Sequence, residues 1–297
     1  MQVPTSRLRR GTRLGAVAAK QVLRSQRTRV AMIGRSQQVR DKLAQASTVA
    51  TAESVVAVLG SMKGVAMKLG QMLAILDLDL VPDGQRAIFQ EKLAVLLDNA
   101  PTTPFPAMKE VIEADLGRPI EEVFAEFGTT PVGAASIGQV YRARLHDGRD
   151  VAVKVQYPGI ETAVRSDLKN LQLLSRLWQA VLPWVTPALI DELAENLERE
   201  LDYPNEAQTQ ARIADQFAGH PCLLVPRAYP ELSGKRVLVT DFVDGRPFSA
   251  IRTLEQAERD RIGEIVYRFY VGSMFLENEF CGDPHPGNIL LTPDGKV

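Results

Sequence analysis

The sequence predicts an α+β protein in which a helical N-terminal extension precedes a sheet-containing domain. Three observations predict this class. Apolar residues recur every three or four positions from about 48 to 76, alternate with polar residues between 139 and 155, and return to helical spacing after 160. The 297 residues are 45% hydrophobic and 24% charged, which is ordinary for a globular protein of about two domains.

The N-terminal residues form a basic arm, which we place at 1–47. Residues 1–40 carry ten Lys or Arg side chains and no acidic one, although the net charge of the whole chain is -1. Such an arm suits an anionic membrane surface, nucleic acid, the acidic remainder of the chain or an organelle transit peptide. We expect a solvated or self-docking arm first, peripheral membrane contact second, and no nucleic acid partner.

The two cysteines, Cys222 and Cys281, lie in apolar contexts rather than in a CxxC motif. This usage favours a reducing compartment. No apolar run approaches the length of a bilayer span. We therefore expect a cytoplasmic protein, peripheral to the inner membrane if the arm makes membrane contact.

Residues 48–117 are predicted to be the helical extension. Apolar residues from Val55 to Leu76 form one helix stripe, and Lys68 and Gln71 fall together on another face. A second helix is expected over 83–97, and the proline-rich stretch at 101–106 breaks it before a short helix near 106–116.

Residues 118–245 are predicted to contain a sheet. Segments 139–145 and 150–155 alternate around an Asp-Gly turn, as in a β-hairpin. Helices follow at 160–182 and 187–217, and a strand at 236–242. Residues 246–297 predict a helix over 254–278 and then a strand, a turn and the beginning of a further strand.

A turn of small residues feeds the first strand of the hairpin. Small residues let backbone N–H groups approach a polyphosphate, although a plain tight turn has the same composition. The turn comprises Gly133, Ala134, Ala135, Ser136, Ile137, Gly138, Gln139 and Val140.

Lys154 is the candidate cation for phosphates. Alternation places Lys154 and Ala152 on one face of their strand, and a strand lysine after such a loop matches the one that kinases use. A solvated lysine is the alternative. Its carboxylate partner stays open, because Pro204 interrupts the acidic helix that carries the candidates Glu198, Glu200, Asp202 and Glu206.

The segment from Gly282 to Leu291 carries the strongest chemical signal. Asp283 and Asn288 are five residues apart, as in the kinase catalytic loop, where the Asp handles a proton and the Asn binds magnesium. Two prolines and Gly287 stiffen this loop. A purely structural loop is the alternative.

Together these motifs resemble the UbiB-type atypical kinases, over about residues 50–297. The matching motifs are Lys68-x-Gly-Gln71, the alanine-rich loop at 134–140, Glu200-x-Asp202 and the catalytic loop from Asp283 to Asn288. The Lys-x-Gly-Gln motif makes the set specific, because ordinary protein kinases and aminoglycoside-type phosphotransferases lack the extension that carries it.

The resemblance implies a protein-kinase-like fold that binds ATP and Mg²⁺. Residues 118–245 would be its nucleotide-binding lobe and 246–297 a partial second lobe. The implied activity is that of an ATPase or kinase acting on a small molecule or a lipid-linked process, in quinone or isoprenoid metabolism, rather than on proteins. It assigns catalysis to Asp283 and Lys154, magnesium to Asn288, and the pairing with Lys154 to Glu206. The loop residues Gly133–Gly138, Val140 and Ala152 would complete the nucleotide site, and Lys68, Gln71, Glu200 and Asp202 would form a lid.

Three departures from the family pattern accompany the resemblance. Gly133 replaces an alanine of the loop, Cys281 replaces a histidine, and the family's Asp-Phe-Gly metal ligand would follow residue 297. We therefore expect a C-terminally truncated chain with an incomplete C-terminal lobe, weak ATP binding and slow turnover. The alternatives are a non-catalytic nucleotide- or lipid-binding scaffold and an aminoglycoside-type phosphotransferase.

Overall fold

The computed structural model describes residues 27–28, 30–40, 42–43, 46, 102–181, 186–277 and 285–297. Side-chain surroundings are described for fewer positions within the helices at 160–181 and 187–201. The helices predicted over 48–97 lie outside the described residues, as do Lys68, Gln71 and Asp283.

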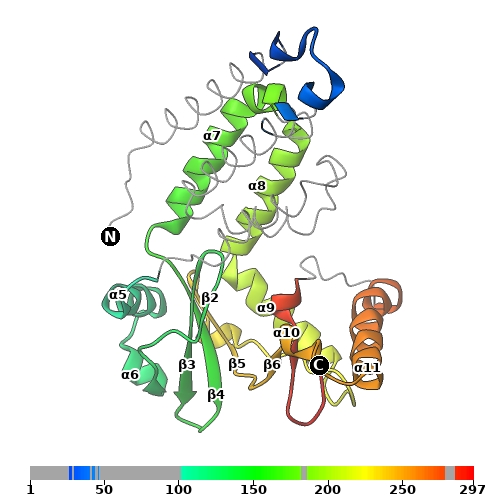
Figure 1. Cartoon of the computed structure of the whole chain (residues 1–297). Coiled ribbons are helices and arrows are strands. Elements are labelled where there is room, and N and C mark those ends of the chain that lie inside the picture. The colour runs from blue at the N-terminus through cyan, green and yellow to red at the C-terminus, as the bar shows by residue number, and fades with distance from the viewer. Residues whose placement is uncertain are drawn as a thin grey trace. The chain divides into compact units, whose positions relative to one another are not determined.

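The chain divides into two compact units, each assembled from stretches far apart in sequence (Figure 1). The first unit comprises Met1–Pro104, Ala134–Gly138 and Gln156–Leu201, and the second comprises Phe105–Gly133, Gln139–Val155 and Asp202–Val297. The small-residue loop at 134–138 therefore belongs to the same unit as the helices that follow the hairpin. The mixture of helices and sheet confirms the α+β class.

Two helices of the first unit, α7 (Ile160–Val181) and α8 (Pro187–Leu201), lie side by side (Figure 1). The sequence predicted the second helix to run to 217, but it ends at Leu201 and a new helix, α9 (Tyr203–Gln216), begins in the second unit. Pro204 occupies the first turn of α9, where its missing N–H leaves no helix hydrogen bond unmade.

The second unit contains an antiparallel sheet with the strand order β1-β3-β4-β5. The strands are β1 (Phe124–Phe127), β3 (Gly138–Leu145), β4 (Asp150–Gln156) and β5 (Val237–Asp241), and the short β2 (Gly133–Ala134) precedes β3. The predicted hairpin is β3–β4, where Leu145 N–H donates to the Arg149 carbonyl at 2.9 Å. Gly148 has φ 90° in its turn, a conformation that favours glycine.

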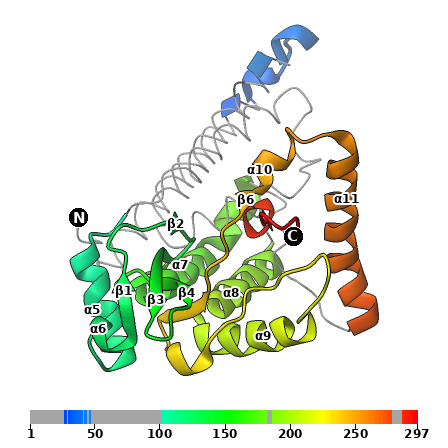
Figure 2. The ribbon, with the colours of Figure 1, turned by 90° about the horizontal axis from the view of Figure 1, so that it is seen from below.

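One face of the sheet packs against α5 (Phe105–Leu116) and α6 (Ile120–Val123), which lie beside β1 and β3 in both views (Figures 1 and 2). Tyr141 and Val153 point to this face and are fully buried. The Tyr141 ring lies 5.7 Å from that of Phe105 and 5.6 Å from that of Phe127, distances at which aromatic pairs add to the energy of burial. The opposite face packs against α9.

A short 3-10 helix, η2 (Pro230–Leu232), precedes β5, and the remaining elements of the second unit follow it. They are β6 (Arg246–Pro247), α10 (Phe248–Ile251), α11 (Gln256–Tyr267), the π-helix η3 (Arg268–Glu277), η4 (Pro286–Asn288) and β7 (Leu290–Leu291). A small core of Ile251, Ile262 and Leu291 joins α10, α11 and β7. Among the helices of the described ranges, none is long and apolar enough to span a membrane.

Asp115 fastens α5 to the start of β5. Its buried carboxylate accepts the backbone N–H groups of Arg236 and Val237 through one oxygen, at 2.7 and 3.0 Å. A Cβ at Gly234 would clash with this carboxylate, so the close approach requires glycine there.

We expect Asp115→Ala to lower the free energy of unfolding by about 1–3 kcal/mol, because two backbone donors lose their buried acceptor. Chemical denaturation measures the loss. Asp115→Asn is the matched control, since its amide oxygen can accept both bonds, and it should cost less than about 1 kcal/mol. Equal losses in both variants would show that the acceptor oxygen is not what matters.

Candidate functional site

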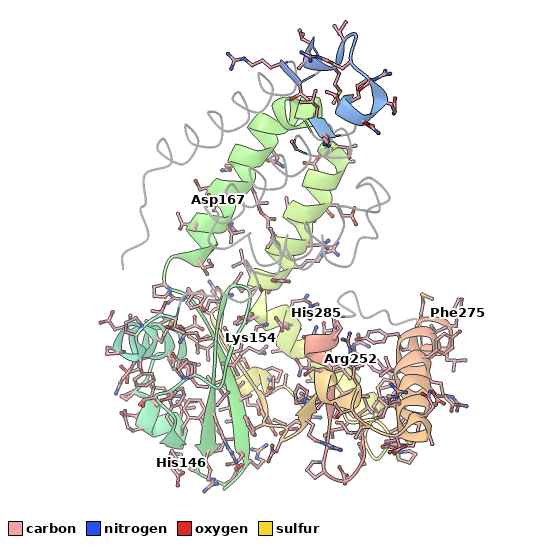
Figure 3. The ribbon with its side chains drawn as sticks, in the orientation of Figure 1. His146, Lys154, Asp167, Arg252, Phe275 and His285 are labelled. Carbon is pink, nitrogen blue, oxygen red and sulfur yellow. The ribbon has the colours of Figure 1, made fainter. Side chains whose placement is uncertain are left out.

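Lys154 lies on β4, on the sheet face that packs against α9 (Figure 3). Its Nζ atom is 3.0 Å from Glu206 Oε1. The neighbouring valines of β4, Val153 and Val155, are fully buried on the other face, so alternation along the strand fixes the side on which Lys154 emerges. The structure thus brings Lys154 and Glu206 together and places Ala152 on their face.

Helix α9 presents one tyrosine and three alanines toward the sheet. Tyr203, Ala207, Ala211 and Ala214 are buried at helical spacing, and Glu206 lies on the same side of the first turn. Alanines let the helix axis approach the strands closely. The Tyr203 ring lies 5.0 Å from Lys154 Nζ, within the range of a cation–π contact.

The Lys154–Glu206 pair orients a charge more than it stabilises the fold. The two side chains are 28% and 33% exposed, and ion pairs that reach solvent contribute only about 0–1 kcal/mol. The Tyr203 ring and the Glu206 carboxylate both contact the Lys154 ammonium and together fix its position. A fixed ammonium on a sheet face suits an anionic ligand such as a phosphate.

The small-residue loop closes as a tight turn within the first unit. Ala135 N–H donates to the Gly138 carbonyl at 2.9 Å, and the Ile137 carbonyl accepts from Tyr157 N–H at 2.9 Å. Ser136 Oγ donates to Glu200 Oε2 at 2.8 Å. Glu200 therefore contacts the loop from the end of α8, whereas Glu206 contacts Lys154.

Gly133 opens into free space, since a Cβ added there would meet nothing within 4 Å. Its backbone φ is not in the left-handed region. An alanine, the residue that the family pattern has at this position, would therefore fit without displacing a neighbour. The departure at Gly133 changes the freedom of the backbone more than the packing around it.

Thr240 on β5 lies on the same sheet face as Lys154, a position that the sequence analysis did not single out. It pairs with Ala152, as Leu238 pairs with Lys154, so its side chain lies on the face of Lys154. The chain then passes through Asp244 and Gly245 to β6. A Cβ at Gly245 would lie 3.0 Å from Leu290 Cβ and 3.3 Å from the Leu291 carbonyl oxygen, so glycine permits this crossing beside β7.

Asp150 ties the hairpin to the segment after β5. Its carbonyl accepts Phe242 N–H at 3.1 Å, and the Arg142 guanidinium lies 4.5 Å from the centre of the Phe242 ring. Hydrogen bonds from Arg142 and then Arg144 to the carboxylate hold the pKa of Asp150 below its ordinary value. The sheet face that carries Lys154 is therefore bordered at the hairpin by the ion pairs of Asp150 with Arg142 and Arg144.

Asn288 lies at the end of η4, and Ile289 separates it from β7. The turn is closed by His285, whose carbonyl accepts Asn288 N–H at 2.9 Å and whose Nδ1 accepts Gly287 N–H at 3.0 Å. His285, marked in Figure 3, is a further residue of the loop whose role the sequence did not indicate. Pairing of Arg246 with Leu291 and of Pro247 with Leu290 then holds the described end of the predicted catalytic loop.

The residues present suit a magnesium nucleotide in kind. Asn288 is exposed and offers an amide oxygen, a ligand type that Mg²⁺ accepts, and Lys154 offers an oriented cation. Within the described ranges, no group of three or more His, Cys, Asp or Glu side chains is placed to hold a metal ion. Magnesium bound here would need phosphate oxygens and water among its ligands, as is usual for this ion.

Comparison with known proteins shows the family of this chain. Residues 95–297 match the ABC1 atypical kinase-like domain. The chain belongs to this family. The UbiB-type resemblance inferred from the motifs is thereby confirmed, and the ABC1 domain covers the sheet, α7 to α11 and the Asn288 loop.

Relatives of this ABC1 chain include AarF domain-containing protein kinase 1 of Xenopus laevis, which is 36% identical over 236 residues. That alignment covers 77% of this chain and 44% of the relative. A protein of Arabidopsis thaliana, ACTIVITY OF BC1 COMPLEX KINASE 8, chloroplastic, is 34% identical over 76% of this chain and 30% of its own length. The chain thus spans less than half the length of these curated relatives.

A solved structure of the Mycobacterium tuberculosis protein Rv3197 in complex with erythromycin has a similar fold. The TM-score is 0.60 and the sequence identity 36%, and the match covers 86% of this chain and 65% of that chain. An atypical kinase-like α+β fold is therefore shown for the ABC1 chain.

The described structure places some of the expected site residues and leaves others outside. It pairs Lys154 with Glu206 and Ser136 with Glu200, and it places Asp202 at the start of α9. The expected lid contacts of Lys68 and Gln71 lie outside the described residues, as does Asp283. Tyr203 and Thr240 were missed, although the helical spacing of Tyr203 with Ala207 was a usable signal.

We expect Ser136→Ala to loosen the loop, because the half-buried Glu200 carboxylate loses a hydroxyl donor worth about 1 kcal/mol. Hydrogen exchange of the Ala135 and Gly138 amides should accelerate about fivefold, the factor that corresponds to that energy. Ser136→Thr keeps a hydroxyl and should exchange like the wild type. Unchanged exchange in Ser136→Ala would mean that the loop is held by its backbone bonds alone.

Proposed function

We propose that this chain binds ATP with Mg²⁺ and acts as an atypical kinase or ATPase on a small molecule or lipid. Lys154 holds the phosphates and Glu206 keeps Lys154 in place. The small-residue loop at 133–138 adds backbone N–H groups, with Val140 and Ala152 beside the nucleotide. Asp283 orients the attacking group, and Asn288 is a magnesium ligand. Magnesium supplies charge neutralisation on the transferred phosphoryl group.

The observation that carries this proposal is the ion pair between Lys154 and Glu206. It fixes an ammonium on a sheet face between a tyrosine ring and a carboxylate, where the charge is available to an anion. Membership of a kinase-like family supports phosphates as that anion. The partner, Glu206, lies 52 residues further along the chain, so the contact depends on the tertiary fold. A lysine that is merely solvated requires no such contact.

A small substrate is supported by the neighbour of similar fold. The Mycobacterium tuberculosis protein of similar fold was solved in complex with erythromycin, a small organic molecule. We therefore propose a small-molecule or lipid acceptor, in quinone or isoprenoid metabolism as the family resemblance implies, rather than a protein acceptor.

The proposal predicts a separation of affinity from stability. Lys154→Met should weaken Mg-ATP binding about 10–100-fold, because a charge-assisted hydrogen bond to phosphate contributes about 1.5–3 kcal/mol. Glu206→Gln should weaken it about tenfold, while each change alters the free energy of unfolding by less than about 1 kcal/mol. Titration calorimetry and denaturation measure the two quantities.

Lys169 is an exposed lysine of α7. The Lys169→Met variant is the matched control and should bind Mg-ATP with the affinity of the wild type. Wild-type chain that fails to bind Mg-ATP, or binding that survives Lys154→Met, would overturn the nucleotide site. Binding without phosphate release or transfer would leave a nucleotide-binding scaffold and refute the enzymatic part of the proposal.

We also propose peripheral membrane contact for the basic arm. Val30 and Ile33 are 66% and 77% exposed beside Arg27, Arg35 and Arg40, a combination typical of segments that lie on anionic bilayers. Replacing these three arginines with glutamine should weaken binding to anionic phospholipid vesicles about 100-fold, at about 1 kcal/mol per charge.

Vesicle sedimentation measures this binding, and purely zwitterionic vesicles provide the baseline. The matched variant replaces the exposed arginines of the second unit, Arg252, Arg259 and Arg268, and should bind as the wild type does. Equal losses in the two variants would remove the arm from the proposal.

A further inference from the structure

The acidic segment around Asp202 forms the end of one helix and the start of another, rather than one bent helix. Helix α8 ends at Leu201, whose carbonyl oxygen accepts the Gln156 side-chain amide at 3.0 Å. Helix α9 begins at Tyr203, and the Asp202 carboxylate accepts the Asn205 N–H at 3.2 Å. Helix ends leave backbone groups without partners inside the helix. Here a side chain serves one such group on each side of the interruption.

Asp202 therefore has an N-cap role that its place in the Glu-x-Asp motif does not reveal. It precedes the first helical residue of α9, and Pro204 follows in the first turn. Its own carbonyl oxygen accepts Glu206 N–H at 3.0 Å, the first backbone bond of the helix. Both the side chain and the backbone of Asp202 thus set where the helix starts.

The start of α9 decides where the Glu206 carboxylate lies. Glu206 occupies the first turn, four residues after Asp202, and first turns fray most easily when a cap is lost. Tyr203, on the same turn, supplies the ring near Lys154 Nζ. Fraying of this one turn would displace both groups that hold Lys154.

The two carboxylates of the Glu-x-Asp motif consequently act on different partners. Glu200, at the end of α8, accepts from the loop residue Ser136, whereas Asp202 caps α9. We propose that Asp202 is a positioning residue that acts through α9, holding Glu206 against Lys154, rather than a residue whose negative charge is needed in a lid. This inference rests on the proposed nucleotide site for its consequence in binding, but not for the cap itself.

Three substitutions at one position separate the two roles. Asparagine and serine cap helices about as well as aspartate but carry no charge. Alanine also carries no charge, and it does not cap a helix. If Asp202 acts as a cap, Asp202→Asn and Asp202→Ser behave like the wild type and Asp202→Ala does not. If its charge is what matters, all three variants lose function alike.

The first measurement is hydrogen exchange of the α9 amides at 205–208. Asp202→Ala should accelerate their exchange about fivefold, the factor that corresponds to loss of a typical cap, while Asp202→Asn and Asp202→Ser stay within about twofold of the wild type. Equal exchange in all four proteins would overturn the cap.

The second measurement is Mg-ATP affinity, combined in a cycle with Glu206→Gln. Asp202→Ala should weaken binding in the wild-type background by about fivefold, and should have a clearly smaller effect once Glu206 is replaced, because only the Tyr203 contact then remains to be lost. Additive losses would show that Asp202 does not act through Glu206. If the wild type binds no Mg-ATP, the proposed function fails, and the exchange order among the three variants still decides the positioning role.

Discussion

The ion pair between Lys154 on β4 and Glu206 on α9 constrains how the elements of the second unit pack. The Lys154–Glu206 contact requires α9 to lie close on the sheet, which the small side chains at Ala207, Ala211 and Ala214 permit. The other face must then be packed independently, and α5 does this through the ring contacts of Phe105 with Phe127 and Tyr141. The same contact explains why the valines of β4 all turn away from the site.

Much of this arrangement was predictable, because the signals are local. The Asp-Gly turn and period-two alternation located the hairpin within one residue at most ends, and alternation alone placed Lys154 and Ala152 on one face. Pro204 correctly indicated a break or a kink. These features depend on near neighbours in sequence, for which steric rules apply directly.

The choice of partners could not be predicted in the same way. Helical periodicity gives relative directions only along one continuous helix, and the restart at Asp202 resets the phase between Glu200 and Glu206. Pairing of Ser136 with Glu200 joins residues 64 apart, so it depends on tertiary packing. The change from the α-helix α11 to the π-helix η3 at Arg268 was also missed, because apolar residues spaced three or four apart are compatible with both kinds of helix.

Placement of the loop at 134–138 in the unit of α7 and α8 limits how the protein can be dissected. A conventional domain boundary drawn in a linker would cut the chain once, but these five residues are inserted between stretches of the other unit. Deleting the helical pair to obtain a minimal sheet domain would take away the Glu200 and Tyr157 contacts on which the loop closes. The minimal fragment that keeps a native loop therefore extends through Leu201, well beyond the hairpin that the loop precedes.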